Sequence, residues 1–534
     1  MLKIYHKLNF VRFGGIDMGK YYTKILGGLF IFLTFSFTYT YGMDVDYIQG
    51  KDRYETAAII ASKMEYSSVI LVNGNSLVDG LSASGLSGAT NAPILLTQVN
   101  VIPQATLNKL SNANTVYLVG GEGVISKEIE NKIINMGKKV IRLGGKLRYD
   151  TSILVANEIE KIKGVQEIYY VNGLTGEADA MSIAPVAASK GNPVILTDGS
   201  STNYRKDVQS YAIGGVGVMN YNFDNFSTRI DGINRYETNK NVINIFFPNK
   251  NHVNLSKSYV LIDALTASAL KEPVVLVADD SDKSVIAGAK SATVLGDISE
   301  IAVSRAKAYL YGDTVVFYAQ HQDDETLFAG SAIVDAIKSV GVENVHIVLV
   351  TDGDASNVFT FERYKDLSYE EKVALRYNEF KAATGKLGVN LDNVVFLKQP
   401  ENQTDDKLLK DTILYFENNY SNVTHITHSY KYENHNQHMH TGSIVNNLYK
   451  EGLISDCRFL ATEDKASNIQ RKYLIESVAD NSLEKQAVLD ACNEYKLDNQ
   501  DMIREGIGYK SVKSLFDKLM SNPKLSSYLH ESGI

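Results

Sequence analysis

The sequence predicts an α/β protein made of four units, each built on a mostly parallel sheet. Short apolar runs alternate with helical patterns from about residue 44 onward, which is typical of βαβ units. One series of motifs occurs three times before about residue 305 and then stops. The 534 residues allow about three or four domains of roughly 100 to 200 residues. We therefore expect three small repeated domains followed by a larger one.

The composition is ordinary for a soluble globular protein, with 44% hydrophobic and 22% charged residues. The net charge of −8 argues against nonspecific nucleic-acid binding, because no basic excess is present to neutralise phosphates. The two cysteines, Cys457 and Cys492, form neither a metal motif nor a disulfide framework. One bridge between them and two unpaired buried thiols both remain open.

Residues 1–42 are predicted to form a secretory signal peptide. Lys20 and Lys24 precede an apolar run at 25–39, and small and turn-forming residues follow it. A transmembrane helix needs about 20 apolar residues, so we expect cleavage, secretion to the cell surface and no stable membrane anchor, with retention as an anchor the alternative. The preceding residues fit this layout poorly, so translation is expected to begin at Met18.

Three copies of an Arg-Tyr-acid-Thr core, beginning at Arg53, Arg148 and Arg235, identify the repeats. Each copy continues with an apolar run (SVILVNG, IYYVNG and SYVLI, expected to be strands), a helix opened by aspartate and a strand opened by proline. A further strand ending in glycine closes the unit. The predicted units are 44–137, 138–224 and a shortened third copy at 225–305.

This order of motifs resembles the cell wall binding type 2 repeat family, found as three tandem copies in surface proteins of Gram-positive bacteria. The resemblance implies three Rossmann-like domains around a pseudo-threefold axis that hold the protein to an anionic cell-wall polymer. The repeated arginines could pair with phosphate or carboxylate of that polymer. The interpretation we favour is that they belong to a helix start in which threonine or the acid is the cap. The wall-binding residues therefore stay unassigned.

Glycine pairs such as Gly120-Gly121 and Gly214-Gly215 end the closing strands of the first two copies. Neither pair completes a dinucleotide-binding or phosphate-loop motif, so we expect tight turns there.

A different α/β order begins near residue 310 and continues to residue 534. TVVFYA at 314–319 is predicted to be a buried strand, followed by a helix from Glu325 to Val340. Later strands are expected at VHIVLV, NVVFL and VTHITH, with helices between them. Such an order predicts a mostly parallel sheet that binds ligands beyond the carboxyl ends of its strands. The polar cluster HQDDE lies at such an end.

Most of the ten histidines lie between His321 and His440. Zinc prefers histidine nitrogen and carboxylate oxygen, and its catalytic sites use three protein ligands and one water. His321 and Asp324 with one histidine of the later loop would form such a set, and Asp323 could act as a base toward that water. Two alternatives are that the acidic residues only stabilise a helix start and that a surface histidine loop binds metal adventitiously.

Four motifs in order, AQHQDDE, TDGD, RYNEFKAATGKLGV and HNQH, resemble the PIG-L/LmbE family of zinc-dependent N-acetylglucosaminide deacetylases. The resemblance implies a Rossmann-like deacetylase domain that binds Zn²⁺ or another divalent metal. By the same resemblance, His321, Asp324 and His438 are the metal ligands, and Asp323 is the general base.

The resemblance further implies that His435 steadies the oxyanion and assists the leaving amine. It also implies that Arg376 binds substrate, although Arg376 could instead pair with Glu379 across one helical turn. The sequence departs from the family pattern where Gln322 replaces a proline, which frees the turn. His440 is close enough in sequence to compete with His438 as a ligand.

Other polar residues lie near these motifs. Glu325 is expected to stabilise the helix start, and His425 and His428 to lie in the loop or behind the ligands. Asp352 or Asp354 could reach the site from the second strand.

We therefore expect a cell-wall-anchored, metal-dependent hydrolase that removes acetyl groups from N-acetylated amino sugars of wall or surface glycans. The first alternative is a structural or adhesive surface protein with a degenerate, non-catalytic deacetylase-like domain. The second is the same chemistry on another amide. The sequence does not identify the glycan or the physiological metal.

Overall fold

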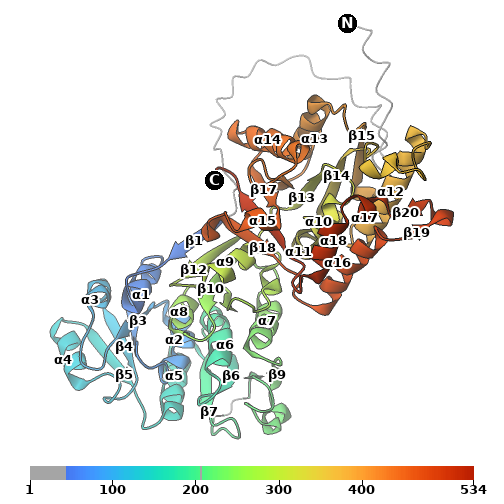
Figure 1. Cartoon of the computed structure of the whole chain (residues 1–534). Coiled ribbons are helices and arrows are strands. Elements are labelled where there is room, and N and C mark those ends of the chain that lie inside the picture. Colours follow the sequence, from blue (N-terminus) through green and yellow to red (C-terminus); the bar gives the residue numbers. More distant parts are fainter. Residues whose placement is uncertain (1–43, 205–206) are drawn as a thin grey trace, which may run out of the picture.

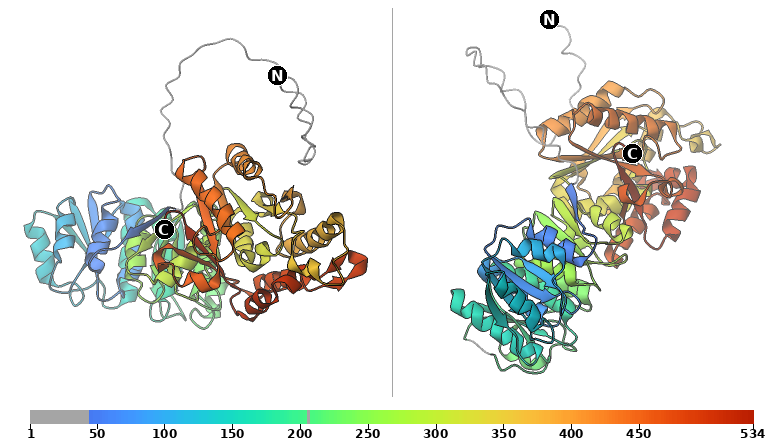
Figure 2. Two further views of the ribbon diagram at one scale, coloured as in Figure 1. Left: turned by 45° about the horizontal axis from the view of Figure 1, so that its top comes forward. Right: turned by 90° about the vertical axis from the view of Figure 1, so that its left-hand side faces the viewer.

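The computed structural model describes residues 44–204 and 207–534. They form two lobes, the repeat lobe (44–307) and the C-terminal domain (310–534) (Figures 1 and 2). The signal peptide predicted at 1–42 and the start predicted at Met18 lie outside these ranges. Among the described residues, no helix has both the length and the apolar character needed to cross a membrane.

The repeat lobe contains three four-stranded sheets in which every strand pair is parallel, which confirms the predicted α/β class. The first sheet has the order β3 (Ile94–Thr97), β2 (Ser68–Asn73), β4 (Thr115–Val119), β5 (Lys139–Leu143). The second has the order β7 (Val194–Thr197), β6 (Glu167–Asn172), β8 (Gln209–Ile213), β9 (Thr228–Ile230). The third has the order β1 (Asp44–Ile48), β12 (Ser291–Leu295), β10 (His252–Lys257), β11 (Val274–Val277).

The sheets divide the chain at different places from the boundaries drawn on the sequence. β5, within the unit drawn at 138–224, pairs with β4 of the first sheet. β9, within 225–305, pairs with β8 of the second sheet, and β1 pairs with β12 of the third. Each sheet thus has an edge strand that comes from the beginning of a different predicted unit. β5 and β9 come from the beginning of the next unit, and β1, from the beginning of the first unit, completes the third sheet. An apolar run does not reveal which sheet it will join.

The third copy also differs from its predicted strand. SYVLI was expected to be a strand, but the strand is β10, and Tyr259 lies in the following loop with 72% of its surface exposed. β10 escapes a search for apolar runs because it buries the polar residues Asn254 and Ser256.

The repeated Arg-Tyr-acid-Thr cores begin helices α1 (Arg53–Ala61), α5 (Arg148–Lys163) and α7 (Arg235–Phe246). At the first of them, the Asp52 carboxylate accepts hydrogen bonds from the Tyr54 and Glu55 N–H groups, as an N-cap does. Arg53 Nη1 donates to the Gly74 carbonyl at 2.6 Å, beyond the end of β2. Equivalent bonds run from Arg148 to Gly173 and from Arg235 to Ser258. These bonds support the structural interpretation of the repeated arginines.

Buried aspartates lie at the strand ends of all three repeats, at Asp79, Asp179 and Asp263. A strand-end glycine faces each of them; at Gly214, φ is +117° and an added Cβ would lie 2.7 Å from Asp179 Oδ2. A side chain there would clash and would strain the backbone. Turns thus occur at the glycine pairs, as predicted.

The centre of the repeat lobe is formed by helices that open with these aspartates. α6 (Glu177–Lys190) packs on both α2 (Ala83–Thr90) and α8 (Ile262–Ser268), and one apolar core includes residues of all three units. The remaining helices of the lobe are α3 (Gln104–Leu110), α4 (Lys127–Asn135) and α9 (Glu300–Lys307).

The C-terminal domain is a seven-stranded sheet, mostly parallel, with β21 antiparallel to its two neighbours. The strand order is β15 (Val394–Gln399), β14 (Val345–Thr351), β13 (Thr314–Ala319), β16 (Val423–His428), β17 (Asp456–Ala461), β21 (Ser527–Glu531), β18 (Leu474–Ser477). The strands predicted for this domain are confirmed, and β13 has the predicted bounds.

Helices cover both faces of this sheet, and each face has its own apolar core. α11 (Gly330–Val340), α12 (Tyr369–Lys386) and α16 (Ser482–Glu494) contribute to one core, and α13 (Asp406–Asn419) and α14 (Asn436–Lys450) to the other. Cys492 belongs to the first core and Cys457 to the second, so both thiols are free. The helix predicted from Glu325 to Val340 is interrupted: α10 (Asp324–Leu327) ends before α11 begins.

Helix α9 joins the two lobes. Arg305, 7% exposed, pairs with Glu476 of β18 at 3.1 Å, and Lys307, 6% exposed, pairs with Glu531 of β21 at 2.8 Å. Truncating one partner of such a buried pair would leave an uncompensated charge, so these contacts favour one relative orientation of the lobes.

Candidate metal centre

The predicted site residues meet where the strand order of the C-terminal sheet reverses. From β13 the chain continues through β14 to β15 on one side, and then returns to β16 on the other side of β13. Ligands of open α/β sheets bind beyond the strand ends at such a point. The turn after β13 contains His321, Asp323 and Asp324, and the loop after β16 leads to His435 and His438.

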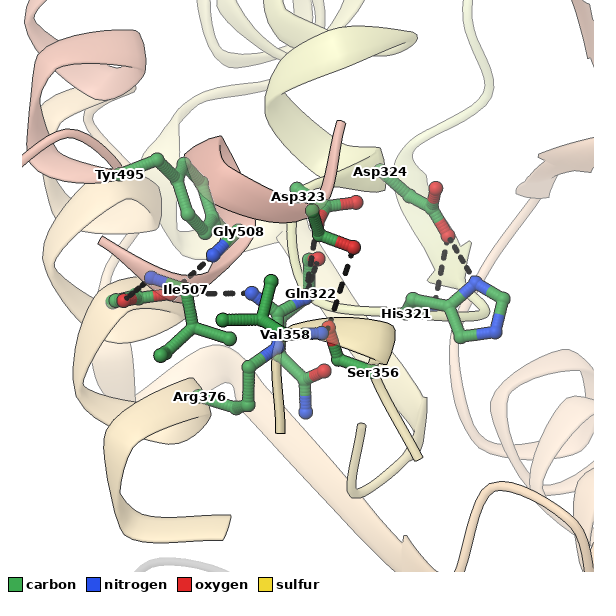
Figure 3. A network of polar contacts seen from close by, with 12 residues as sticks. His321, Gln322, Asp323, Asp324, Ser356, Val358, Arg376, Tyr495, Ile507 and Gly508 are labelled. Atoms are coloured by element: carbon green, nitrogen blue, oxygen red, sulfur yellow. Dashed lines mark hydrogen bonds and ion pairs between the residues drawn. The ribbon is translucent and has the colours of Figure 1, made fainter. Parts of the chain in front are cut away.

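The three predicted metal ligands converge. His321 Nδ1 lies 3.0 Å from His438 Nε2, and Asp324 Oδ2 lies 3.6 Å from the first nitrogen and 3.4 Å from the second. Bonds of about 2.0–2.1 Å in a tetrahedron place ligand atoms about 3.3 Å apart. The donor atoms therefore fit a zinc-sized cation. Figure 3 shows Asp324 pointing toward His321.

Asp324 is the most strongly held carboxylate of this cluster. Its Oδ2 accepts from the His321 N–H at 2.7 Å and lies 3.1 Å from His428 Nε2. Burial alone would raise its pKa, but His438, His428 and the His321 bond hold the pKa of Asp324 well below its ordinary value. Asp324 therefore remains an anion, as a metal ligand must.

His428 is closer to the ligands than its place in the strand suggested. It is fully buried, and its ring stacks on that of His438 with centroids 3.8 Å apart. Asp324, His428 and His438 form a second possible metal-binding group alongside His321, His435 and His438. Because the Asp324–His428 contact is a hydrogen bond, we assign His428 to the support of Asp324.

Further polar groups orient the ligand histidines from behind. Glu433 Oε2 lies 3.3 Å from His438 Nδ1, and Glu433 Oε1 accepts from the backbone N–H of His435 at 3.2 Å. Gln437 Oε1 lies 2.8 Å from His321 Nε2. A partner at the outer nitrogen leaves the inner nitrogen free for a metal. Burial lowers the pKa of His438, but Asp324 and Glu433 raise it to about 10, so their negative charge favours a cation here.

Asp323, the predicted base, has an unusual backbone. Its φ of +102° lies in the left-handed region, which costs energy for a residue with a side chain. The Glu325 carboxylate holds this conformation by accepting from the Asp323 N–H at 3.1 Å, and Tyr495 donates to Glu325 at 2.8 Å. Glu325 thus supports the conformation of Asp323 as well as the helix start. Burial raises the pKa of Asp323 to about 6, a value suited to a general base.

Arg376 lies beneath Asp323 and is buried, with 3% of its surface exposed. Its Nη2 donates to Asp323 Oδ2 at 2.9 Å and to the Gln322 carbonyl, and its Nη1 pairs with Glu379 at 3.1 Å. Glu379 in turn accepts from backbone N–H groups at Ile507 and Gly508. Arg376 therefore positions Asp323 in this structure, and its expected contact with substrate stays a prediction.

Gln322 occupies the place of the usual proline and is fully buried. Its Nε2 donates to the Thr351 carbonyl at the end of β14 at 3.1 Å. This bond and the bond from Arg376 fix the turn, so the freedom expected from the loss of proline is restrained.

His435 is the N-cap residue of α14 and is exposed as a residue, and its side chain makes no capping hydrogen bond. Partial loss of hydration around the ring, together with the neighbouring His438 and His321, lowers the pKa of His435 to about 4, so its ring is neutral at pH 7. Beside it lies a cavity of about 310 Å³, the site cavity. Its lining includes Phe328, Glu433, Lys518 and Tyr528. The cavity borders the metal ligands through His435, whose ring centroid lies 4.6 Å from that of His438 and 5.1 Å from that of His321.

The remaining candidates lie elsewhere. His440 is exposed and pairs with Asp406 at 2.8 Å, so it does not compete with His438. His425 is buried between Tyr318 and Glu417, away from the ligands. Asp352 accepts from the hydroxyls of Tyr369 and Tyr377, and Asp354 accepts from the Glu401 N–H.

Sequence reasoning missed Glu433 and Gln437. Both lie inside the histidine-rich loop, and their proximity to His435 and His438 was the available signal. It also missed Tyr495, because nothing in its local sequence indicates a bond to the turn after β13.

Comparisons with known proteins match two family models to the chain. Residues 48–130, 142–224 and 229–321 match the family model described as Cell wall binding domain 2 (CWB2), and residues 316–449 match the model described as GlcNAc-PI de-N-acetylase (PIG-L). The protein has three CWB2 repeats followed by a PIG-L domain. Both resemblances noted in the sequence are confirmed.

Individual relatives share only parts of the chain. It is 27% identical over 316 residues to N-acetylmuramoyl-L-alanine amidase LytC of Bacillus subtilis (strain 168), covering 54% of this chain and 63% of the relative. It is 33% identical over 264 residues to the Amidase enhancer of the same organism, covering 46% and 36%. Cwp8 from Clostridium difficile aligns with a TM-score of 0.46 at 29% identity, over 49% of this chain and 51% of that one. The chain thus spans less than two thirds of both curated relatives.

Proposed function

We propose that this protein is a secreted, cell-wall-associated, metal-dependent hydrolase that removes acetyl groups from N-acetylated amino sugars of wall or surface glycans. The observation that supports it best is the convergence of His321, Asp324 and His438 to within 3.6 Å of one another, beside an unligated Asp323. A degenerate domain would have no reason to keep a strained base next to an intact ligand set.

A divalent metal such as zinc, held by these three residues, would polarise the amide carbonyl and lower the pKa of the attacking water. Asp323 Oδ2 is engaged by Arg376, which leaves Oδ1 to take the proton of that water. The neutral His435 ring borders the site cavity and can donate a hydrogen bond to the developing oxyanion. His435 would also assist the departing amine, which leaves the sugar with a free amino group.

The three CWB2 repeats are proposed to hold the hydrolase against an anionic cell-wall polymer. The buried contacts of α9 with β18 and β21 would then keep the metal centre at a fixed position relative to the repeats. The glycan substrate would be presented by the same surface to which the protein is bound.

The proposal is tested with the whole protein loaded with zinc, by measuring acetate release from N-acetylglucosamine oligomers and wall fragments. Release by the parent and not by Asp323→Asn is expected. Bound zinc without release from any fragment would indicate another amide, and no zinc with no release would favour a binding domain without catalysis.

A further inference from the structure

The third repeat has a pocket beyond the carboxyl ends of its strands, and we call it the third-repeat pocket. Its volume is about 580 Å³, a size typical of ligand pockets. β11 lies on one side of β10 and β12 on the other, and ligands of open α/β sheets bind where the strand order reverses in this way. The lining of the pocket includes Lys257, Ser258, Tyr259, Val260, Asp279 and Ser281.

The first two repeats have a buried asparagine at the corresponding place. Asn73 ends β2 and Asn172 ends β6, and both are buried. The Asn73 amide donates to the Val124 carbonyl at 2.7 Å, and the Asn172 amide donates to the Val218 carbonyl at 2.8 Å. Each bond connects a strand end to the loop that follows the closing strand of the repeat. The asparagine thus bridges the strand ends in both repeats.

The third repeat lacks both parts of this bridge. Lys257 takes the place of the asparagine, since it ends β10 and pairs in register with Val277 of β11, as the two asparagines pair with β3 and β7. The loop from the strand-end glycine to the next helix cap covers 120–126 and 214–220 in the first two repeats, but only 296–299 in the third. Two changes specific to the third repeat thus leave its pocket without the bridge.

An exposed tyrosine borders the third-repeat pocket. Tyr259 is 72% exposed, and the guanidinium carbon of Arg235 lies 4.2 Å from its ring centroid, which favours a fixed position of the ring. Arg235 also donates to the Ser258 carbonyl at 2.6 Å, so the guanidinium is held from two sides. In the other repeats, the residue after the arginine-bonded carbonyl is Asn75 or Leu174. Only the third repeat therefore has an aromatic ring here, and such a ring offers an apolar face and a polar tip to a pyranose.

The charges of the third-repeat pocket favour an uncharged ligand. Its charged lining residues are Lys257, Asp279 and Asp280. Lys257 Nζ lies 3.9 Å from the Asp297 carboxylate, and Asp280 pairs with Arg305 at 2.8 Å. An anionic polymer would meet the Asp279 carboxylate while Lys257 is already paired. A neutral sugar can instead donate a hydroxyl to Asp279 and accept from Lys257.

We propose that the third-repeat pocket binds an uncharged sugar of an N-acetylglucosamine-type glycan, the class of glycan on which the metal centre is proposed to act. Tyr259 contacts the sugar ring, and Lys257 and Asp279 form hydrogen bonds with its hydroxyls. The inference rests on the proposed function for the identity of the glycan, but binding at this pocket does not require hydrolysis. The third repeat would then differ in its ligand from repeats that hold an anionic polymer.

A fluorescent reporter at the pocket tests the proposal directly, because the sequence contains no tryptophan. Tyr259→Trp in the whole protein should show a saturable blue shift of its emission when the N-acetylglucosamine hexamer is added. The matched control is Leu174→Trp, at the equivalent position of the second repeat, which is 56% exposed and should show no shift. No shift in Tyr259→Trp, or equal shifts in both variants, would overturn the proposal. A response to a hyaluronan hexasaccharide, which contains acidic sugars, that exceeds the response to the neutral hexamer would overturn the assignment of an uncharged ligand.

The same reporter tests the role of Lys257. Lys257→Asn, combined with Tyr259→Trp, should weaken binding of the neutral hexamer about tenfold, because a hydrogen bond from a charged group is lost. Lys240→Asn is the control, since Lys240 pairs with Asp282 at 2.8 Å and does not line the pocket. Equal affinities of the two variants would contradict a contact between Lys257 and the sugar.

Acetate release is measured separately, so that the two proposals can fail independently. A fluorescence response without acetate release would refute the proposed hydrolysis and leave the binding site in place. Acetate release without a fluorescence response would refute the binding site and leave the hydrolysis in place.

Discussion

Buried aspartates lie at the carboxyl ends of parallel strands in both lobes, yet their surroundings give them opposite properties. In the repeats, Asp179 and Asp263 are buried, and burial raises the pKa of both, that of Asp179 to about 7. The cation that opposes this shift is Arg235 at Asp179, while Lys257 and then Arg53 oppose it at Asp263. In the PIG-L domain, two histidines and a backbone N–H hold the pKa of Asp324 well below its ordinary value. The same place in the sheet therefore contains a partly protonated acid in one lobe and a firm anion in the other.

The difference shows that the sheet topology places an aspartate at the strand ends, while the neighbouring hydrogen-bond donors and charges determine whether that aspartate is ionised. Among the described residues, the only groups able to hold a metal lie in the PIG-L domain. In the repeats, the strand-end crevice is filled by glycine backbone close to the aspartate, as at Gly214. A carboxylate at a strand end can thus contribute to a metal site only where other ligand atoms lie close to it.

Removal of a metal-ligating side chain should have the largest effect on activity. It would also distinguish the strand-end crevice of the PIG-L domain most clearly from those of the repeats. His438→Ala is expected to abolish stoichiometric zinc binding and acetate release, because three protein ligands are the minimum of a catalytic site. Metal content is measured by atomic emission after dialysis. His440→Ala is the matched control, since His440 faces Asp406, and loss of zinc in that variant would contradict the assignment.

Loss of the base should be the next largest effect. Asp323→Asn is expected to lower the rate about 10²- to 10⁴-fold, because general-base assistance has that magnitude. Zinc content should stay at the parent level, since Asp323 is not among the three converging ligands. A variant that loses zinc as well would show that Asp323 belongs to the ligand set, and the comparison of its role with that of Asp324 would then be wrong.

Glu433 tests the support behind the ligands. Glu433→Gln should weaken zinc binding about 10- to 100-fold, measured by competition with a chelator, because outer partners of ligand histidines have effects of this size. Glu463→Gln is the control, since Glu463 also lines the site cavity but pairs with Lys518 at 2.9 Å. Equal zinc affinities of the two variants would mean that Glu433 does not support the ligand histidines.

Motif order in the sequence predicted the α/β class, the repeats and the residues that converge on the metal centre. Those residues occur in short contiguous motifs, which can be recognised directly in the sequence. The residues that contact the motifs are distant in the sequence and cannot be recognised in this way. Tyr495 donates to Glu325 from 170 positions away, and the Gly508 N–H donates to Glu379 from 129 positions away; no local pattern reveals such contacts.

For a related reason, the sequence does not predict which sheet each strand joins. β1 and β12 pair across almost the whole repeat lobe, and β5 and β9 join the sheet that precedes them. Apolar periodicity reports that a segment is a strand, while its partner depends on how the units pack.

The remaining effect lies in the repeat lobe and concerns stability as a function of pH, not the metal centre. Asp179 has a pKa of about 7 in the folded protein, mainly because it is buried, and an ordinary value of 3.8. Between these values the folded state binds more protons than the unfolded state, so this group lowers stability as the pH rises from 4 to 7. Each pKa unit corresponds to about 1.4 kcal/mol.

Asp179→Asn removes this dependence and should raise the melting temperature at pH 8 by about 2–4 °C for each kcal/mol gained, with a smaller change at pH 5. Asp198→Asn in the same repeat should do the opposite, because backbone N–H groups of Ser200 and Ser201 lower the pKa of Asp198. A lower melting temperature for Asp179→Asn at pH 8 would mean that attraction to Arg235 outweighs burial. In that case Asp179 would be charged and paired with Arg235. Asp179 and Asp324 would then differ in the residues that contact them, not in their protonation state.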